Sequence, residues 1–248
     1  MAKLRSLQEE LNQRILQTRS NDDYNNPNRE WLRPVSSATK SFFMMHAICE
    51  ENLQCYHFDC RSIEGFEYLA KKNITVSDFR ELIHHDDRAF FDRCREKGHR
   101  FASGKSLDVL SGYSLVFECR MQNSRKEFKR ILFKYQLVEL PSNGGYALLL
   151  QLFPLLYMEK EMQHRIYYVI NNITCEIAEK SRGVGITYAE QQVLKRLIYS
   201  NSVKAIAEAL DKSENTVDTH RKRIYSKFGV GLHSHAVLYA LHVGLIKL

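Results

Sequence analysis

One stretch decides how the C-terminal part of this chain folds: Ser213-Glu-Asn-Thr-Val-Asp-Thr-His-Arg-Lys-Arg-Ile-Tyr-Ser-Lys-Phe-Gly229. Ser213 is a favoured N-cap residue, and Gly229 can adopt the left-handed conformation that ends many helices, so the residues between them predict one helix. With the period of an α-helix, Val217, Ile224 and Phe228 fall on the same side of it. The predicted helix therefore has one apolar side and one polar side.

The polar side of this helix carries short polar side chains bordered by cations. Short polar groups can read base edges in the major groove of DNA, and long cations can reach the phosphates beside them. We therefore expect this helix to lie in a DNA groove. The expected base-reading residues are Asn215, Asp218, Thr219 and Lys222, and the expected phosphate-binding residues are Thr216, Arg221, Arg223 and Lys227.

Three more helices are predicted around this one, and the four share one apolar core. The first opens with a capping box, Thr187-x-x-Glu190. The second is capped by Ser202 and ends just before Ser213, so that the second and third helices form a helix-turn-helix. The fourth ends at Gly244. The apolar residues expected to point inward from the first, second and fourth helices are Val193, Leu194, Leu197, Ile198, Val203, Ile206, Ala207, Leu210, Ala236, Val237, Ala240 and Leu241.

A longer pattern runs through these helices: Thr187-x-x-Glu190, Val193-Leu194, Ile206-Ala207-x-x-Leu210, Ser213-x-x-Thr216-Val217-x-x-His220, Ile224, Lys227, Val230, Ala236-Val237 and Gly244-Leu245-Ile246. This pattern resembles the LuxR/NarL-type DNA-binding domain without a gap. The resemblance implies an all-α four-helix domain at 183–248 that binds double-stranded DNA. Ser200, Ala205 and His233 replace residues that are usual in the family, and the fold should survive all three changes.

Asp218 is a fourth departure from the family, in which lysine is common directly after Thr216-Val217. A carboxylate can only accept a hydrogen bond from a base, for example from the amino group of cytosine. The preferred DNA sequence should then differ from that of lysine-bearing relatives. Alternatively, Asp218 forms an ion pair with Lys222 one turn later on the helix surface. The sequence leaves both interpretations open.

The charge of the chain also favours a polyanionic partner. The whole chain has a formal net charge of +7, and 183–248 contains nine basic and five acidic side chains. Binding of cationic side chains to DNA releases counterions, which favours association. A membrane surface also attracts cations, but the sequence has no long cationic amphipathic helix with large exposed apolar residues. We expect double-stranded DNA as the partner, and no membrane.

The sequence of 40–154 predicts an α+β domain. Apolar runs at 42–48 and 53–58 predict two strands, and a helical segment follows. Three later segments alternate apolar and polar residues with the period of a half-buried strand, and the turn 141–145 helps to make them an antiparallel meander. The alternating apolar residues are Leu115, Phe117, Cys119 and Met121, then Ile131, Phe133, Tyr135 and Leu137, then Tyr146, Leu148, Leu150 and Leu152.

The run Ile83-His84-His85-Asp86-Asp87 lies in the helical segment before the meander. With the order of strands and helices, it resembles a PAS-type sensor domain, where a His-Pro-Asp-Asp turn is common; His85 stands in place of the proline. The resemblance implies an antiparallel sheet with flanking helices that senses a signal. The four polar residues predict a turn that caps the helix beginning near Arg88, and their alternative role is to bind a metal ion.

No cofactor is predicted for this PAS-like domain. A small-molecule ligand would occupy the space between the meander and the helices, lined by Phe117, Phe133 and Leu148, although these side chains also suit an ordinary core. The six cysteines show no paired C-x-x-C spacing, which favours buried free thiols and does not imply zinc. The alternative is a redox or metal cluster, for which the candidates are Cys49, Cys55 and Cys60.

The segment 155–182 is predicted to be a helix that joins the two domains, because it contains no glycine or proline. Its apolar residues form a stripe close to a heptad pattern, which suits a dimerising helix or one packed on its own sheet. We favour dimerisation, since helix-turn-helix proteins usually read two half-sites. A helix and a polar loop are also expected at 1–39. The stripe of 155–182 is Met162, Ile166, Val169, Ile173 and Ile177, and that of the N-terminal helix is Leu4, Leu7, Leu11 and Ile15.

Together, these patterns predict a sequence-specific transcription regulator, a homodimer whose PAS-like domain senses a signal and controls the helix-turn-helix domain. The alternative is a protein-interaction module whose C-terminal helices contact RNA polymerase or another regulator. No Walker loop, Gly-x-Ser-x-Gly elbow or kinase signature indicates an enzyme. The sequence has no apolar window long enough for a membrane span, and its N-terminus is too polar for a signal peptide. Both features predict a cytoplasmic protein.

Overall fold

The computed structural model describes residues 42–47, 54–57, 65–71, 76–139, 146–155, 165–181 and 185–247. The chain divides into two compact units, Met1–Pro154 and Leu155–Leu248, and each is described by itself. In the described part of the chain, no helix is both long enough and apolar enough to cross a membrane.

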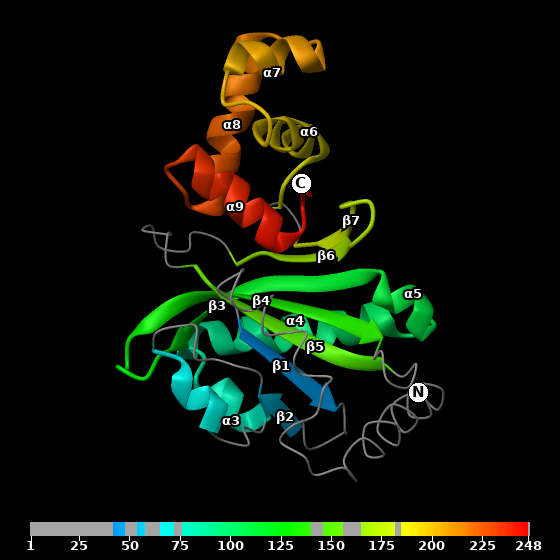
Figure 1. Ribbon diagram of the computed structural model, residues 1–248, viewed down its shortest axis with the longest axis vertical. Coiled ribbons are helices and arrows are strands. Elements are labelled where there is room, and N and C mark those ends of the chain that lie inside the picture. Colours follow the sequence, from blue (N-terminus) through cyan, green and yellow to red (C-terminus); the bar gives the residue numbers. More distant parts are fainter. Residues whose placement is uncertain are drawn as a thin grey trace. The chain divides into compact units, whose positions relative to one another are not determined.

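The N-terminal unit is built on an antiparallel sheet. Its five described strands follow the order β2-β1-β5-β4-β3 (Figure 1). The predicted two early strands and the later meander are confirmed, and with them the PAS-like α+β fold. The turn predicted at 141–145 lies outside the described residues. The strands are β1 (Phe42–Ala47), β2 (Gln54–His57), β3 (Tyr113–Gln122), β4 (Phe128–Glu139) and β5 (Tyr146–Pro154).

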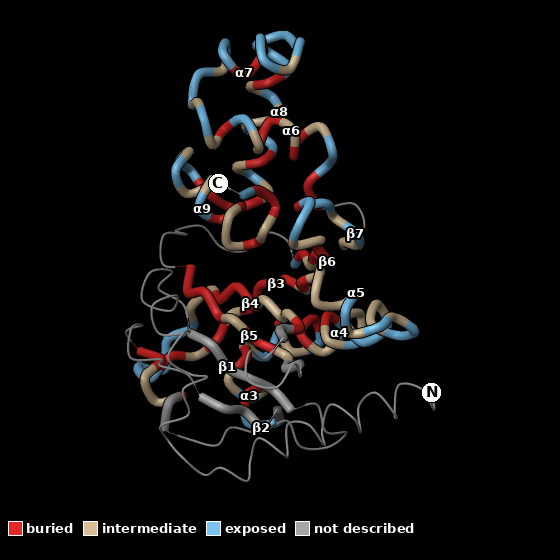
Figure 2. The backbone as a smooth tube through the Cα atoms, turned by 45° about the vertical axis from the view of Figure 1, so that its right-hand side comes forward, coloured by how far each residue is buried: buried red, intermediate tan, exposed pale blue. Residues whose placement is uncertain are grey.

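Helices of this unit pack on the face of the sheet that carries Phe117 and Phe133. The ring of Phe91 lies edge-on to both of these rings, each at 5.8 Å between centroids, and Phe79 is edge-on to Phe133. All four rings are buried, and buried residues run through β3, β4 and β5 (Figure 2). The helical elements are the 3-10 helix η4 (Glu67–Lys71) and the α-helices α3 (Val76–Glu81), α4 (His85–Ala102) and α5 (Leu107–Ser111).

Strand β3 is buried on both faces along its middle. The alternating sequence predicted a strand buried on one face only, and that prediction is wrong. Val116 and Glu118, which alternate with the core residues, are both buried. The carboxylate of Glu118 can be buried because the guanidinium of Arg130 on β4 donates to it at 2.6 Å. Alternation identified the core face correctly, but it could not reveal this pairing across the two strands.

The C-terminal unit contains the helices that the sequence predicts. Thr187 and Glu190 form both hydrogen bonds of the capping box, Ser202 and Ser213 cap the next two helices, and Gly229 and Gly244 end the last two in the left-handed conformation. The all-α helix-turn-helix arrangement is therefore confirmed. The helices are α6 (Tyr188–Leu197), α7 (Val203–Leu210), α8 (Glu214–Phe228) and α9 (His233–Val243).

The helix predicted at 155–182 is wrong, because its second half forms a β-hairpin. The strands are β6 (Tyr167–Asn171) and β7 (Ile177–Lys180), which pair antiparallel. Three consecutive residues of β6 are buried, a pattern that fits a strand covered on both faces. Ile173, which the helical stripe would bury, is 77% exposed in the turn. Met162 of the stripe lies outside the described residues.

The turn of this hairpin has a local cause. The side-chain oxygen of Asn171 accepts hydrogen bonds from the backbone N–H groups of Ile173 and Thr174, at 2.8 and 3.0 Å. Such an Asx turn offers the backbone an alternative to helix. Glycine and proline are therefore not needed to turn the chain here.

The hairpin packs on the helices of its own unit. Gln191 of α6 donates to the carbonyl oxygens of Cys175 at 2.6 Å and Leu245 at 3.2 Å, and the side chain is buried. The backbone N–H of Ile186 donates to the hydroxyl of Tyr168 at 3.3 Å. The C-terminal unit thus includes a hairpin that is hydrogen-bonded to α6 and to the segment just before it.

The N-terminal helix and loop predicted at 1–39 lie outside the described residues, as do Cys49 and Cys60. Cys55 lies in β2, where only the backbone is described.

Candidate nucleic-acid interface

Helix α8 separates its predicted DNA-contacting residues from its apolar side. Val217, Ile224 and Phe228 are fully buried against the unit's core. Asp218 is partly exposed, with 29% of its side chain accessible. The exposed residues of the predicted set are Asn215, Thr216, Thr219, Lys222 and Arg223.

The N-terminal end of α8 is held by its cap. The hydroxyl of Ser213 accepts from the backbone N–H of Thr216 at 3.1 Å and lies 2.8 Å from the hydroxyl of Thr216. Both side chains are exposed. The cap therefore fixes the first turn of α8 while leaving Thr216 at the surface, where the sequence places a phosphate contact.

Asp218 forms an ion pair with Lys222, which is one of the two interpretations that the sequence allows. Lys222 Nζ lies 2.8 Å from Asp218 Oδ2, and the guanidinium of Arg221 donates to Asp218 Oδ1 at 3.0 Å. The hydrogen bond from Lys222 and the charges of both cations hold the pKa of Asp218 below its ordinary value. The carboxylate is therefore ionised at neutral pH, and it faces the same side of the helix as the exposed polar residues.

Arg221 is not a freely exposed cation. Besides its bond to Asp218, its guanidinium donates to the carbonyl oxygen of Asn201 at 3.5 Å, and only 26% of its side chain is exposed. This contact joins α8 to the segment before α7. Two bonds inside the unit thus fix the position of the guanidinium for which the sequence predicts a phosphate contact.

Lys227 has an internal role that the sequence analysis did not predict. Its ammonium lies 2.7 and 2.9 Å from the two carboxylate oxygens of Glu190, and it donates to the carbonyl of Gly185 at 3.1 Å. The Glu190 side chain is 2% exposed. We therefore withdraw Lys227 from the phosphate-binding set, because its donors point into the unit.

The carboxylate of Glu190 stays charged although it is buried. Burial alone would raise its pKa, but hydrogen bonds from Lys227 and from the backbone of Thr187 hold the pKa below its ordinary value. Glu190 thus completes the capping box of α6 and also anchors the C-terminal end of α8. The capping-box pattern predicted the first role and gave no sign of the second.

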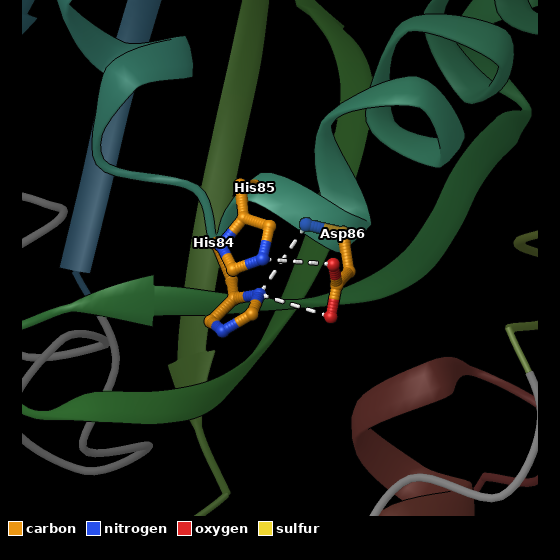
Figure 3. Close-up of side chains that lie close together, drawn as sticks. All are labelled: His84, His85 and Asp86. Atoms are coloured by element: carbon orange, nitrogen blue, oxygen red, sulfur yellow. Dashed lines mark hydrogen bonds and ion pairs between the residues drawn. The ribbon is translucent and has the colours of Figure 1, made fainter.

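Among the described residues, one group of three side chains could hold a metal ion. It consists of His84, His85 and Asp86 (Figure 3). Their ligand atoms all lie within 4.8 Å of one another. His85 Nε2 is 2.9 Å from Asp86 Oδ1, and the two imidazole rings stack at 4.3 Å between centroids. The arrangement offers both a helix cap and a place for a cation.

The surroundings of this cluster favour the cap. His84 is the N-cap of α4, and its Nδ1 accepts from the backbone N–H of Asp86 at 3.3 Å. The guanidinium of Arg120, 3.5 Å from the Asp86 carboxylate, and the helix N-terminus both disfavour a bound cation. Asp87 is buried and receives 2.8 and 2.9 Å bonds from Arg120. His84 is the cap, but α4 begins at His85 and not near Arg88, so the predicted turn is wrong for the other three residues, which form the first turn of the helix. The bonds between Asp87 and Arg120 tie α4 to β3.

Two of the three side chains of the candidate ligand pocket belong to the aromatic core. Phe117 and Phe133 stack at 5.2 Å between ring centroids, and Phe91 contacts both. Leu148 lies on β5 opposite Leu137 and is partly exposed. The contacts of Phe117 and Phe133 are those of an ordinary core, which the sequence favours for these side chains.

The described cysteine thiols are buried and belong to no disulfide. They belong to Cys94, Cys119 and Cys175. Burial raises the pKa of the Cys94 thiol far above its ordinary value, so it stays protonated. The prediction of buried cysteines outside disulfides is confirmed for these three residues.

Residues 185–240 match the family described as "Bacterial regulatory proteins, luxR family". The match covers α6, α7 and α8 and most of α9, which together carry the helix-turn-helix. The C-terminal unit therefore contains a LuxR-type helix-turn-helix domain, as the sequence pattern indicated. A comparison with curated protein sequences finds no match.

Solved structures with a likeness to the chain include structures of VqmA. A phage VqmA–DPO complex is 14% identical over 89% of this chain and 92% of that chain, with a TM-score of 0.30. A Vibrio cholerae VqmA dimer, described as a LuxR-type receptor, is 19% identical over 64% of each chain, with a TM-score of 0.24. A Vibrio cholera VqmA–ligand–DNA complex is 14% identical over 86% of this chain and 88% of that chain, also with a TM-score of 0.24.

Proposed function

We propose that this chain is a sequence-specific DNA-binding transcription regulator. The observation that carries the proposal is the exposed polar face of α8, within a LuxR-type helix-turn-helix domain. On that face, Asn215, Asp218, Thr219 and Lys222 read base edges, while Arg223 and Thr216 bind phosphates. The bonds of Arg221 to Asp218 and Asn201 limit where its guanidinium can reach a phosphate. No catalytic step is part of this function.

We further propose that the regulator acts as a homodimer that reads two half-sites. One helix-turn-helix unit covers few base pairs, and pairing two units doubles the contacts and fixes their spacing. The PAS-like unit would sense a signal, such as a small molecule, and control the DNA-binding unit. The hairpin β6–β7 supports this control, since it is hydrogen-bonded to the start of α6 and follows the PAS-like unit in the chain.

The salt dependence of DNA affinity tests the proposed function. The affinity of the full chain for duplex DNA should fall steeply with salt, and the slope should decrease by about one for each phosphate contact removed. Replacing Lys222 and Arg223 by alanine should weaken binding and flatten the slope. Arg196→Ala removes an exposed cation from α6 and serves as the matched control, with a small effect. Weak DNA binding whose affinity and salt slope do not change when Lys222 and Arg223 are replaced would contradict the proposal.

A second candidate function is contact with RNA polymerase or another regulator. Tyr188 at the start of α6 and Tyr199 just after it are each 78% exposed, and exposed aromatic residues often mark protein interfaces. Asp218 also makes the exposed face of α8 less cationic. Binding of purified RNA polymerase that is lost with Tyr188→Ala and Tyr199→Ala, without DNA binding by the chain, would favour this alternative.

A further inference from the structure

Asp218 and Lys222 present a hydrogen-bond acceptor next to a donor on the exposed side of α8. The atoms Asp218 Oδ2 and Lys222 Nζ lie 2.8 Å apart. Asn215 and Thr219, on the same side of the helix, are exposed. The ion pair is thus placed among the residues proposed to meet base edges, away from the buried Val217 and Ile224.

Both members of this pair have unused hydrogen-bonding capacity. An ionised carboxylate offers about four lone-pair positions, and an ammonium about three donors. Arg221 binds one oxygen of Asp218 and Lys222 binds the other. The side chain of Asp218 is 29% exposed, and that of Lys222 is 76% exposed. A DNA base can therefore bind each of them without breaking the pair.

One kind of base pair has the complementary pattern in the major groove. A C·G pair presents the cytosine amino donor beside the O6 and N7 acceptors of guanine. Carboxylates accept from cytosine N4, and lysine donates to guanine O6 and N7. An A·T pair also has a donor next to an acceptor, but thymine offers only O4 and places a methyl group beside it. The pair of charges fits C·G better than A·T.

We propose that Asp218 and Lys222 act as a unit that reads one C·G base pair of each half-site. The carboxylate of Asp218 accepts from the cytosine amino group, and the ammonium of Lys222 donates to guanine. The inference rests on the proposed function, since it needs α8 in the major groove. Asp218 then determines specificity more than affinity, because its charge is repelled by the phosphates at every site.

The test is selection of binding sites from random duplex DNA by the full chain, followed by dissociation constants for the selected site and its single-base-pair variants. The wild type should require C·G at one position of the half-site. Asp218→Asn should reduce the preference for C·G at that position about tenfold. The affinity of this variant for non-specific DNA should stay equal or increase. Lys222→Ala should relax the same position, because the two side chains read it together.

Glu214→Gln is the matched control. It removes one negative charge from an exposed position of the same helix, outside the ion pair. It should raise the affinity for all sites alike and leave the preference at every position unchanged. A change in base preference equal to that of Asp218→Asn would show that loss of charge alone explains the effect, and would overturn the proposal.

The other outcomes separate this inference from the proposed function. Specific binding with the same base preferences before and after Asp218→Asn overturns the inference and leaves the function in place. Relaxation of two different positions by Asp218→Asn and Lys222→Ala also overturns it, because the residues then do not act as a unit. Absence of DNA binding by the wild type overturns both.

Discussion

Two lysines of helix α8 meet carboxylates at almost the same distance, in opposite surroundings. In the middle of the helix, Lys222 lies 2.8 Å from Asp218 and is 76% exposed. At the C-terminal end, Lys227 lies 2.7 Å from Glu190, and their side chains are 22% and 2% exposed. The first pair faces solvent and is available to a partner. The second fixes the helix to the start of α6.

The difference shows that a positive charge on α8 does not by itself tell whether a residue binds DNA or stabilises the fold. A surface ion pair contributes about 0–1 kcal/mol to stability, because water and salt screen it. A buried carboxylate that loses its partner destabilises the protein much more, since its charge stays desolvated. The Lys227–Glu190 pair should therefore affect folding, and the Lys222–Asp218 pair should affect binding.

Lys227→Met should have the largest effect on stability. It leaves the buried Glu190 carboxylate without its cation, and we expect a loss of about 3 kcal/mol in the free energy of unfolding of the C-terminal unit. Hydrogen exchange of the α6 and α8 backbone amides in the full chain measures this loss. Lys222→Met is the matched control and should change the same quantity by less than about 0.5 kcal/mol. Equal effects of the two substitutions would remove the distinction between the pairs.

Acidification should reduce the cost of Lys227→Met. In the wild type, the pKa of Glu190 is held below the ordinary value of 4.5, so the carboxylate adds stability above that pH, and this contribution is lost as pH falls through the lowered pKa. In the variant, burial without Lys227 should raise the pKa of Glu190. Its carboxyl then takes up a proton in the folded state at higher pH, which relieves the penalty. The difference in unfolding free energy should shrink between neutral pH and about pH 4. A constant difference would contradict the assigned cause.

Lys222→Ala should weaken specific DNA binding by about 2 kcal/mol, because it removes a base contact. Fluorescence anisotropy on a selected site measures the change. Lys227→Met, compared at a temperature where the unit remains folded, should leave the affinity and its salt slope nearly unchanged. If Lys227→Met lowered the salt slope by about one, Lys227 would contact a phosphate after all.

Ser213→Ala should have the smallest of these effects, a loss of about 1 kcal/mol in stability, because the first turn of α8 loses its cap. Ser226→Ala is the control, because Ser226 is exposed and lies away from both ends of the same helix. Hydrogen exchange should show no loss of stability in this variant. A larger loss for Ser226→Ala than for Ser213→Ala would show that the cap does not hold this end of the helix.

The helical wheel of α8 shows how much the sequence can predict. With Val217 at the centre of the apolar side, Arg221 lies about 40° and Lys227 about 80° away, whereas Lys222 and Arg223 lie about 140° and 120° away. The two cations near the apolar side are those held inside the unit. The wheel thus contained a signal that separates the residues, but the partner of Lys227 lies on another helix and could not be predicted.

Caps and periodicity predicted the helices because they act over one or two turns. Ser213, Gly229 and the capping box of Thr187 and Glu190 each act on backbone groups next to them. The hairpin β6–β7 was missed because its turn depends on one asparagine side chain, and because Gln191, which is distant in the sequence, binds the connection between the two strands at Cys175. A near-heptad stripe of few residues does not distinguish a helix from such strands.

Selection of random duplex DNA by the full chain tests the central claim most directly, when the wild type is compared with a variant carrying Lys222→Ala and Arg223→Ala. The account predicts that the wild type enriches an inverted repeat with half-sites about one helical turn apart, and that the variant loses this enrichment. Enrichment of no sequence by the wild type, or of the same sequence by both proteins, would contradict DNA recognition by the exposed face of α8.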